Sequence, residues 1–408
     1  MDWNYQQPVK IIFGNGKISA LKEVIAELGE TDGILICSRS FRKSGLADKV
    51  IAELGETDGI LICSRSFRKS GLADKVMAEA DGLLTAVYSD VSPNPEVSEV
   101  DACAELMREQ GSKFVVALGG GSVMDLAKAA ATIATVDDSI RLYHGTGKAL
   151  PETFLPLIAV PTTSGTGSEV TSVSVLSDYE TGKKAPILSP NFFPAYAVVD
   201  PELTYTCPPT VTACSGIDVL CQAIEGYWSV NHQPICDALA IHAAKLVFEH
   251  LPIAYANPTD ATAREKMAEA SVIAGLAFAL PKTTSSHAVS YPLTNLYGIP
   301  HGEACGLTID YFAKVNALLE TDGRVTAFAK AIGFTDADEM ANAITALKKQ
   351  IGLRTDLTDL DLSDAQIDEL VQLSHHPNLE NNPVKITDDI LYDLFGTLTK
   401  KDIYVEQP

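Results

Sequence analysis

The sequence has few basic residues for its length, and it lacks long hydrophobic runs. Lysine and arginine together number 31 against 53 aspartates and glutamates, which gives 408 residues a formal net charge of −22. An acidic surface repels phosphate backbones and anionic lipids, so we expect neither nucleic acid nor a membrane among its partners. No segment reaches the roughly 18 uninterrupted apolar residues of a membrane span. These shortages favour an acidic globular protein whose partners are small molecules.

Paired cysteines and a secretory signal are also lacking. The eight cysteines are scattered singly, without a CxxC pair, which is typical of reduced thiols and not of a disulfide framework. Met1–Gly14 has no basic start followed by an apolar run and a small-residue cleavage site, the pattern that a signal peptide needs. We therefore expect a cytoplasmic protein.

The chain contains one perfect internal repeat. Ile25–Val50 reads IAELGETDGILICSRSFRKSGLADKV, and Ile51–Val76 repeats it without a mismatch. Functional repeat proteins use several diverged units. A single perfect copy is typical of a recent duplication or of an error in the sequence. Each copy carries a strand-like GILIC run, so a sheet with one place for that strand must exclude the other copy or add it at an edge.

The first half of the chain alternates between strand-like and helix-like patterns. Two segments have helical spacing, Ile18–Leu28 and Val97–Gln110. Strand-like apolar runs occur at Val9–Phe13, Gly33–Cys37 or its copy Gly59–Cys63, Leu84–Tyr88, Lys113–Leu118 and Leu155–Val160. This alternation predicts a parallel sheet covered by helices.

After about Pro208 the pattern becomes helical. The segments with helical periodicity are Val211–Tyr227, Pro234–His250, Ala261–Leu280, Gly302–Leu319, Val325–Ile332 and Ala337–Ile351. Strand-like runs become scarce, and the stretch between Asp200 and Pro209 is rich in proline. We therefore predict an α/β dinucleotide-binding domain at residues 1–207, containing the repeat, and an all-helical domain at residues 208–408.

A glycine-rich turn links a strand to a helix in the first domain. Val115–Lys128 reads VVALGGGSVMDLAK. Glycines let backbone N–H groups approach a phosphate closely, and a helix start adds oriented donors and a positive dipole end. The strand–loop–helix context therefore predicts a site for the pyrophosphate of a dinucleotide.

This loop is neither GxGxxG nor a P-loop, and it resembles the GGGSxxDxAK motif of group III, iron-containing alcohol dehydrogenases. Pro161–Thr171 and Pro186–Thr204 also look like that family. The resemblance implies a dehydroquinate synthase-like architecture and a nicotinamide cofactor. By the resemblance, the cofactor residues are Gly120, Gly121 and Ser122 at the pyrophosphate, Thr162, Thr163 and Thr166 at the nicotinamide half, and Lys184 at the ribose. Asp125 also falls on the motif, as a cofactor contact or as a plain charge near the helix start.

The residues after the second strand bear on the choice between NAD and NADP. NAD-preferring members carry an acid there, which takes the ribose hydroxyls. This sequence has Ser38-Arg39 in one copy and Ser64-Arg65 in the other. No acid is present to repel the 2′-phosphate of NADPH. Ser64 and Arg65 therefore predict that NADPH is used at least as well as NADH. The alternative is that Arg65 is a solvated surface charge.

Three short segments of the helical domain carry candidate metal ligands. SGIDVLCQAIEGYWS places Asp218 and Gln222 four residues apart, on one helix face. SSHAVSYPL carries His287, and GIPHGEA carries His301. One carboxylate and two imidazoles suit Fe²⁺ or Zn²⁺. The family pattern is Asp-x-x-x-His with a histidine in each of the other segments, and Asp218, His287 and His301 match it.

Two positions depart from the family pattern. Gln222 replaces a histidine, and its carbonyl oxygen is a weaker, harder ligand than imidazole. Tyr291 stands where many members carry a histidine thought to relay protons, and a tyrosine relays only with a lowered pKa or through water. The resemblance still implies Asp218, Gln222, His287 and His301 at one divalent metal, Fe²⁺ first and Zn²⁺ second, with Tyr291 as the proton relay.

The implied reaction is metal-dependent reduction of a small aldehyde by NADH or NADPH. CQAIEGYWS, HAVSYPLTNLYGIPHG and the missing cofactor acid look like the phosphonoacetaldehyde reductases of the group, which yield 2-hydroxyethylphosphonate. Three alternatives are a general short-chain alcohol dehydrogenase, a dehydroquinate synthase-like lyase or cyclase, and an impaired member. Family members commonly assemble, so a homodimer is expected.

Overall fold

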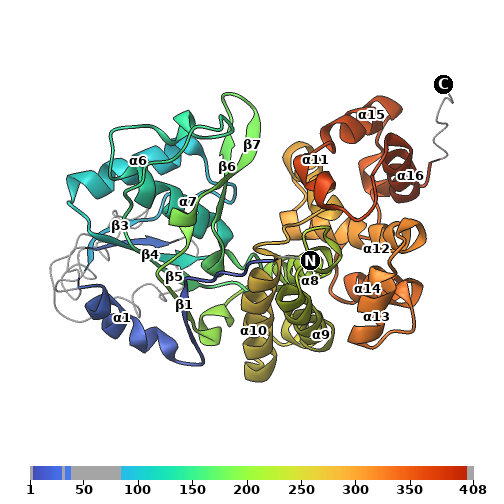
Figure 1. Cartoon of the computed structure of the whole chain (residues 1–408), viewed down its shortest axis with the longest axis horizontal. Helices are drawn as coiled ribbons and strands as arrows, with labels where there is room; N and C mark the ends of the chain where they lie inside the picture. Colours follow the sequence, from blue (N-terminus) through green and yellow to red (C-terminus); the bar gives the residue numbers. More distant parts are fainter. Residues whose placement is uncertain (1–2, 30–32, 38–83, 402–408) are drawn as a thin grey trace. The chain divides into compact units, whose positions relative to one another are not determined.

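The computed structural model describes residues 3–29, 33–37 and 84–401. The chain divides into two compact units, coloured from blue to green and from green to red in Figure 1. The α/β unit consists of Gln6–Thr163 and Gly167–Thr206. The helical unit consists of Met1–Tyr5, Ser164–Thr166 and Cys207–Pro408. A parallel-sheet unit and a helical unit are what the sequence pattern predicted.

A six-stranded parallel sheet forms the centre of the α/β unit (Figure 1). Its strands, in spatial order, are β1 (Lys10–Phe13), β8 (Tyr196–Val199), β5 (Leu157–Pro161), β4 (Phe114–Gly119), β2 (Gly33–Cys37) and β3 (Leu84–Tyr88). The central strands β4 and β5 are buried along their whole length, as continuous apolar runs in a parallel sheet must be. Within the described residues, the α-helices of this unit are α1 (Leu21–Leu28), α6 (Val97–Glu109) and α7 (Gly121–Ile133).

Two features of the α/β unit have weak sequence signals. Strand β8 has only four residues, and its neighbour β1 is equally short. An antiparallel pair, β6 (Val173–Asp178) and β7 (Lys183–Leu188), lies outside the main sheet. The lysines of β7 interrupt the apolar alternation that marks a half-buried strand, so this hairpin was not predicted.

Strand β2 comes from the first copy of the repeat. Gly33–Cys37 pairs in parallel with β4 on one side and with β3 on the other. The corresponding strand of the second copy, Gly59–Cys63, lies outside the described residues, and so do Ser38, Arg39, Ser64 and Arg65. The cofactor role predicted for Ser64 and Arg65 stays a prediction.

The helical unit is built around a long buried helix, α8 (Pro209–Trp228). Its other α-helices are α9 (Pro234–Ala256), α10 (Ala261–Phe278), α11 (Ser285–Tyr297), α12 (His301–Leu319), α13 (Arg324–Ile332), α14 (Ala337–Gln350), α15 (Asp364–Leu373) and α16 (Asp388–Thr399). Between Cys207 and Lys401 the structure contains no strand. The apolar faces of these helices share one continuous core.

Helix α11 was not predicted from the sequence. Its segment is rich in serine and contains Pro292, which removes a backbone donor from the helix interior. The helix nevertheless forms because its first residues are buried, and it ends at Gly298, whose φ of 67° a glycine adopts without strain. Tertiary packing here outweighs a poor local propensity.

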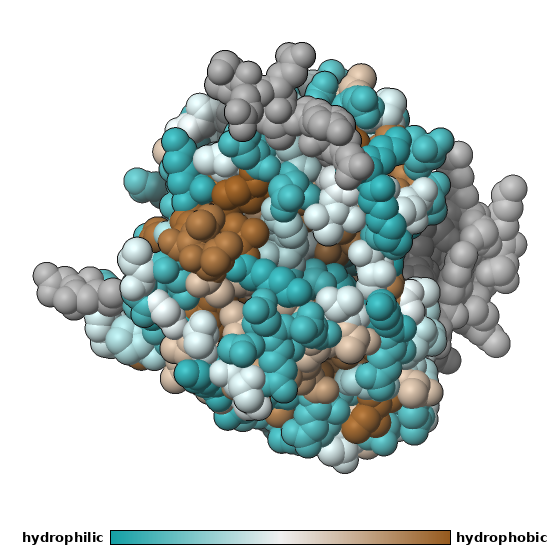
Figure 2. Space-filling model, turned by 90° about the vertical axis from the view of Figure 1, so that its right-hand side faces the viewer, coloured by the Kyte–Doolittle hydropathy of each residue, from teal (hydrophilic) through white to brown (hydrophobic). Residues whose placement is uncertain are grey.

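None of the described helices combines the length and the hydropathy that crossing a bilayer requires. Figure 2 shows one face of the molecule, which is largely hydrophilic and carries a compact hydrophobic patch. The most exposed large apolar side chain among the described residues is Leu318, near the end of α12, at 81%.

Candidate active site

The glycine loop joins β4 to α7 in a turn that excludes larger side chains. A Cβ atom on Gly119 would lie 2.5 Å from Cγ2 of Val123, and one on Gly120 would lie 3.0 Å from Oγ1 of Thr163. The backbone of Thr162 donates to the carbonyl of Gly119 at 3.0 Å, which holds the segment after β5 beside the loop. Helix α7 has no acid in its first turn, so its N-terminus is electrostatically suited to an anion.

The structure brings most of the predicted cofactor residues together. Gly120 precedes α7, and Gly121 and Ser122 open it, with Thr163 in contact range of Gly120. The Ser122 hydroxyl donates to the Pro93 carbonyl, and the Lys184 ammonium donates to Oδ1 of Asn94 at 2.9 Å. Thr166 belongs to the helical unit. The cofactor contacts of all these residues stay predictions.

The Pro93–Asn94 loop is a neighbour of this site that sequence reasoning missed. It contacts both Ser122 and Lys184, which are 62 residues apart in the sequence. A proline followed by asparagine before a helix is an ordinary turn signal. The sequence therefore gave no sign that this turn faces the glycine loop.

Asp125 anchors α7 to strand β6. Its carboxylate accepts hydrogen bonds from the Ser168 hydroxyl at 3.0 Å and from the Val175 backbone at 3.1 Å. Lys128, one turn later, donates to the same Ser168 hydroxyl at 2.8 Å and to the Val173 carbonyl at 3.0 Å. Both side chains form structural contacts within the α/β unit, and these contacts account for their place in the motif.

A buried carboxyl beside this pair makes the stability of the α/β unit depend on pH. Burial raises the pKa of Glu169 to about 7, although Lys128 opposes the shift. Because the folded state then binds the proton more tightly than the unfolded chain, Glu169 lowers the stability as pH rises from about 4.5 to about 7. Glu169→Gln lacks this titration. We expect its stability relative to wild type to increase over that range, by about 3 kcal/mol at most.

The measurement is the thermal midpoint of variant and wild type at pH 5.5 and pH 7.5. The exposed Glu152→Gln in the same unit is the matched control and should show little difference between the two pH values. A Glu169→Gln difference that is constant or shrinks with rising pH would contradict the buried-carboxyl assignment.

Four candidate metal ligands meet inside the helical unit. Asp218 lies on α8, His287 in the first turn of α11, and His301 and Cys305 in the first two turns of α12. Ligand atoms of these four side chains all lie within 4.8 Å of one another. Asp218, His287 and His301 were predicted from the sequence, and Cys305 was not. Its four-residue spacing from His301 places it on the same helix face, a signal that was present but not used.

Glu225 fixes the ring of His287. It is fully buried on α8, and one carboxylate oxygen pairs with Nδ1 of His287. The other oxygen accepts hydrogen bonds from the Ser286 backbone at 2.6 Å and the Thr284 hydroxyl at 3.0 Å. A carboxylate on Nδ1 holds the proton there and leaves the Nε2 lone pair for a metal. Sequence reasoning missed Glu225, although it lies two turns after Asp218 on the same face.

His301 is held in the same tautomer. The Ser290 hydroxyl donates to the His287 carbonyl at 2.7 Å, so toward Nδ1 of His301, at 3.2 Å, it can only accept. That contact therefore requires a proton on Nδ1 of His301 and leaves Nε2 with a lone pair. Nε2 of His287 also lies 3.4 Å from Oδ1 of Asp218. Lone pairs of both histidines are thus available to the same cluster.

The buried acceptors of this cluster fit a cation. Among the described residues, Oδ1 of Asp218 and Oε1 of Gln222 are buried and accept no hydrogen bond. The Gln222 amide instead donates to Oδ2 of Asp218 at 3.1 Å. Buried acceptors without donors are costly unless a cation satisfies them. One carboxylate, two imidazoles and a thiol form a donor set for Zn²⁺ or Fe²⁺.

Electrostatics favour charged forms within the cluster. Burial alone would raise the pKa of the Cys305 thiol, but the imidazoles of His287 and His301 lower it below its ordinary value. Burial opposes charge on His287, yet Cys305 and Glu225 raise its pKa well above the ordinary value. These shifts show a cluster that binds positive charge, whether it is a proton or a metal ion.

Tyr291 lies next to the cluster on α11. Its ring stacks on His301 at a centroid distance of 6.0 Å and contacts His376 at 4.7 Å. Burial raises the pKa of Tyr291 to about 12, so the phenol keeps its proton at neutral pH. A relay through a lowered tyrosine pKa has no support in this arrangement, and the catalytic role of Tyr291 stays a prediction.

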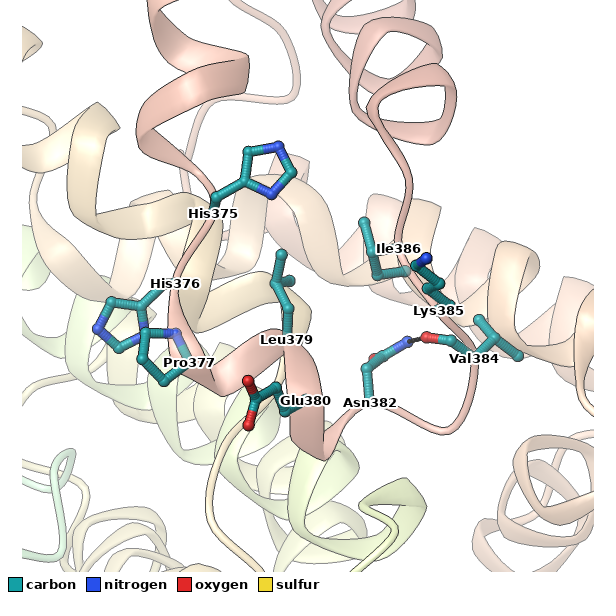
Figure 3. Close-up of a pocket in the computed structure, with 9 residues that line it drawn as sticks. All are labelled: His375, His376, Pro377, Leu379, Glu380, Asn382, Val384, Lys385 and Ile386. Atoms are coloured by element: carbon teal, nitrogen blue, oxygen red, sulfur yellow. Dashed lines mark hydrogen bonds between the residues drawn. The ribbon is translucent and has the colours of Figure 1, made fainter.

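A cavity lies in the connection between α15 and α16, and His376 is one of the residues that line it (Figure 3). Its lining residues are His375, His376, Pro377, Leu379, Glu380, Asn382, Val384, Lys385 and Ile386. Nδ1 of His376 accepts from the Asn378 backbone at 3.2 Å, and burial lowers the pKa of His376. The ring is therefore a neutral Nε2–H donor. Among the described residues, Lys385 forms no ion pair, whereas His375 pairs with Asp388 at 2.8 Å.

Comparisons with known proteins identify the family. The sequence model for the iron-containing alcohol dehydrogenase domain matches residues 51–201, and the model for the C-terminal part of the Fe-containing family matches residues 212–398. The first match begins with the second copy of the repeat, whereas β2 comes from the first copy.

Individual relatives agree with these matches. The crystal structure of sulfoacetaldehyde reductase from Bifidobacterium kashiwanohense in complex with NAD⁺ is 55% identical, with a TM-score of 0.87, and covers 98% of this chain and 100% of that one. The 1,3-propanediol dehydrogenase of Citrobacter freundii is 30% identical over 96% of this chain and 98% of its own length. The NADPH-dependent butanol dehydrogenase of Clostridium saccharobutylicum is 33% identical over 72% of this chain and 76% of its own length. This chain is therefore an enzyme of the iron-containing alcohol dehydrogenase family.

Proposed function

We propose that this enzyme reduces a short aldehyde with an anionic head, a sulfonate or a phosphonate, to the corresponding alcohol. The observation that carries the proposal is the 55% identity, over 98% of the chain, to a sulfoacetaldehyde reductase. The motifs of the chain also resemble those of phosphonoacetaldehyde reductases, which indicates the same class of substrate. The reaction consumes one aldehyde, one NAD(P)H and one proton, and it yields one alcohol and one NAD(P)⁺.

Each unit has its own part in this proposal. In the α/β unit, the glycine loop and the start of α7 hold the cofactor pyrophosphate through backbone N–H groups. The cofactor supplies the hydride. In the helical unit, Asp218, His287 and His301 would hold a divalent metal, which when bound polarises the carbonyl oxygen. Glu225 and Ser290 hold the two imidazoles in the tautomer that this requires. The raised pKa of Tyr291 makes its phenol a weak acid, so water supplies the proton that the product alcohol gains.

The cavity that His376 and Lys385 line is the candidate site for the anionic head group. Lys385 offers a positive charge, and His376 offers an N–H donor, in a cavity whose wall also contains Glu380. His376 contacts Tyr291, which stacks on the candidate ligand His301.

Further properties follow from the sequence as proposals. The absence of an acid at Ser64-Arg65 favours NADPH used at least as well as NADH, and the relatives include both an NAD⁺ complex and an NADPH-dependent enzyme. The metal is Fe²⁺ or Zn²⁺. The cytoplasmic location and the homodimer stay predictions.

The test compares substrates on the metal-loaded, anaerobically prepared enzyme. We expect kcat/KM for sulfoacetaldehyde or phosphonoacetaldehyde to exceed that for propanal by at least about 100-fold. Propanal has no charged head group, so the polar groups of the pocket would be left without a partner when it binds. Each substrate is measured with NADPH and with NADH. Equal or better turnover of propanal would assign a general short-chain alcohol dehydrogenase activity instead.

Two charge variants test the cavity. Lys385→Met should raise KM for the anionic aldehydes about fivefold, the effect of about 1 kcal/mol from a partly solvated ion pair, and leave propanal unchanged. Glu380→Gln should lower the same KM. The matched control is Lys245→Met on the exposed face of α9. Equal effects on charged and uncharged aldehydes would exclude the cavity as the head-group site.

A further inference from the structure

Cys305 occupies a position that the family pattern does not use for metal binding. It is fully buried in the second turn of α12, and its Sγ atom lies 3.8 Å from Nε2 of His301. Its Sγ is one of the four atoms that lie within 4.8 Å of one another, together with ligand atoms of Asp218, His287 and His301. The same cluster contains two buried oxygens without hydrogen-bond donors, so the feature does not rest on the thiol alone.

Gln222 stands in place of one of the family's three histidines, and its amide nitrogen is engaged with a neighbouring ligand. Its amide nitrogen donates to Oδ2 of Asp218 at 3.1 Å. That contact fixes the carboxylate and turns its other oxygen, Oδ1, toward His287. Gln222 therefore orients a ligand, and the donor set is one ligand short of the family's four. Among the histidine, cysteine, aspartate and glutamate side chains of the described residues, Cys305 is the one that groups closely enough with these three ligands to complete the set.

We propose that the Cys305 thiolate is the fourth protein ligand of the metal, with Asp218, His287 and His301, and that Gln222 positions Asp218. The inference rests on the proposed metal site. Replacing an imidazole with a thiolate makes the donor set softer, so the site selects Zn²⁺ over Fe²⁺ more strongly than an Asp–His₃ site does. On binding, the thiol loses its proton to solvent and the sulfur lone pair enters the metal bond.

Cobalt substitution gives a readout that is independent of turnover. The full-length protein is stripped with a chelator, loaded with one equivalent of Co²⁺ without oxygen, and examined by absorption spectroscopy. A thiolate bound to Co²⁺ produces a strong near-ultraviolet charge-transfer band, which carboxylate, amide and imidazole ligands do not produce. We expect this band in the wild type, its loss in Cys305→Ser and Cys305→Ala, and its retention in Cys221→Ala.

Cys221 is the matched control because it is a buried thiol on α8, one turn from Asp218, and is not a member of the four-residue cluster. Zinc affinity, measured by competition with a chromophoric chelator, should fall by roughly 10- to 100-fold or more in Cys305→Ser. It should change little in Cys221→Ala.

The outcomes separate this inference from the proposed metal site. Bound Co²⁺ without the band in the wild type, or a band that persists in Cys305→Ala, would overturn the thiolate ligand and leave the metal site standing. Failure of the wild type to bind Co²⁺ or Zn²⁺ would overturn both. A band that disappears only in Cys221→Ala would assign the thiolate ligand to Cys221 on α8, and it would likewise overturn the inference.

Discussion

Replacing His287 by alanine should abolish metal binding and aldehyde reduction together. The imidazole is buried between Asp218 and Glu225, with Nε2 3.4 Å from the Asp218 carboxylate and Nδ1 on Glu225. Without it the cluster loses a neutral nitrogen donor and keeps two buried carboxylates. We expect the metal content to fall below about a tenth of the wild-type value and kcat/KM to fall by at least about 10³-fold.

Removal of a buried partner can also unfold the protein, so the experiment needs a conservative variant. His287→Ala leaves one oxygen of the buried Glu225 carboxylate without its imidazole partner, which costs a few kcal/mol. His287→Gln keeps a donor for Glu225 and fills similar space. It should restore much of the stability but not the metal content. His242→Ala is the matched control, because His242 is exposed on α9, where it pairs with Glu269. A folded His287→Gln with full metal content and activity would refute the ligand assignment.

The parts of the fold that the sequence predicts well are those with long, uniform patterns. The buried strands β4 and β5 read as apolar runs, and α8, α9 and α12 have sustained helical periodicity. Short or irregular elements gave no such signal. Strand β8 has four residues, and α11 contains a proline and a serine-rich start. These elements form because the surrounding core buries them, which no local pattern records.

The candidate site divides in the same way. Asp218, His287 and His301 were recognised because the family uses those residue types at that spacing. Glu225 and Cys305 were missed, because the role of a glutamate or a cysteine on a buried helix face cannot be inferred until the helix packed against it is known. Only the structure shows that Glu225 meets His287 across two helices, 62 residues apart in the sequence, and that Cys305 lies opposite Asp218.

Gly302→Ala should be among the most damaging single substitutions in the helical unit. Gly302 follows His301 in the first turn of α12, where α12 crosses α8. A Cβ atom there would lie 1.9 Å from the carbonyl oxygen of Cys214 and 3.0 Å from Cβ of Asp218. Because the first of these is a backbone atom, the helices must separate, and His301 must move away from Asp218. We expect a loss of about 3 kcal/mol or more in the free energy of unfolding, together with loss of bound metal.

Gly306→Ala, one turn later on the same helix, is the matched control. Its added Cβ would lie 2.7 Å from Cγ1 of Ile217, a side-chain atom that can shift to another rotamer. We expect a smaller destabilisation, of about 1–2 kcal/mol, with metal retained. Denaturant unfolding and metal analysis of the folded fraction measure both effects. If the two variants were equally stable and equally metalated, the close approach of α12 to α8 would not be what places His301, and the position of the ligand would depend on its own contact with Ser290.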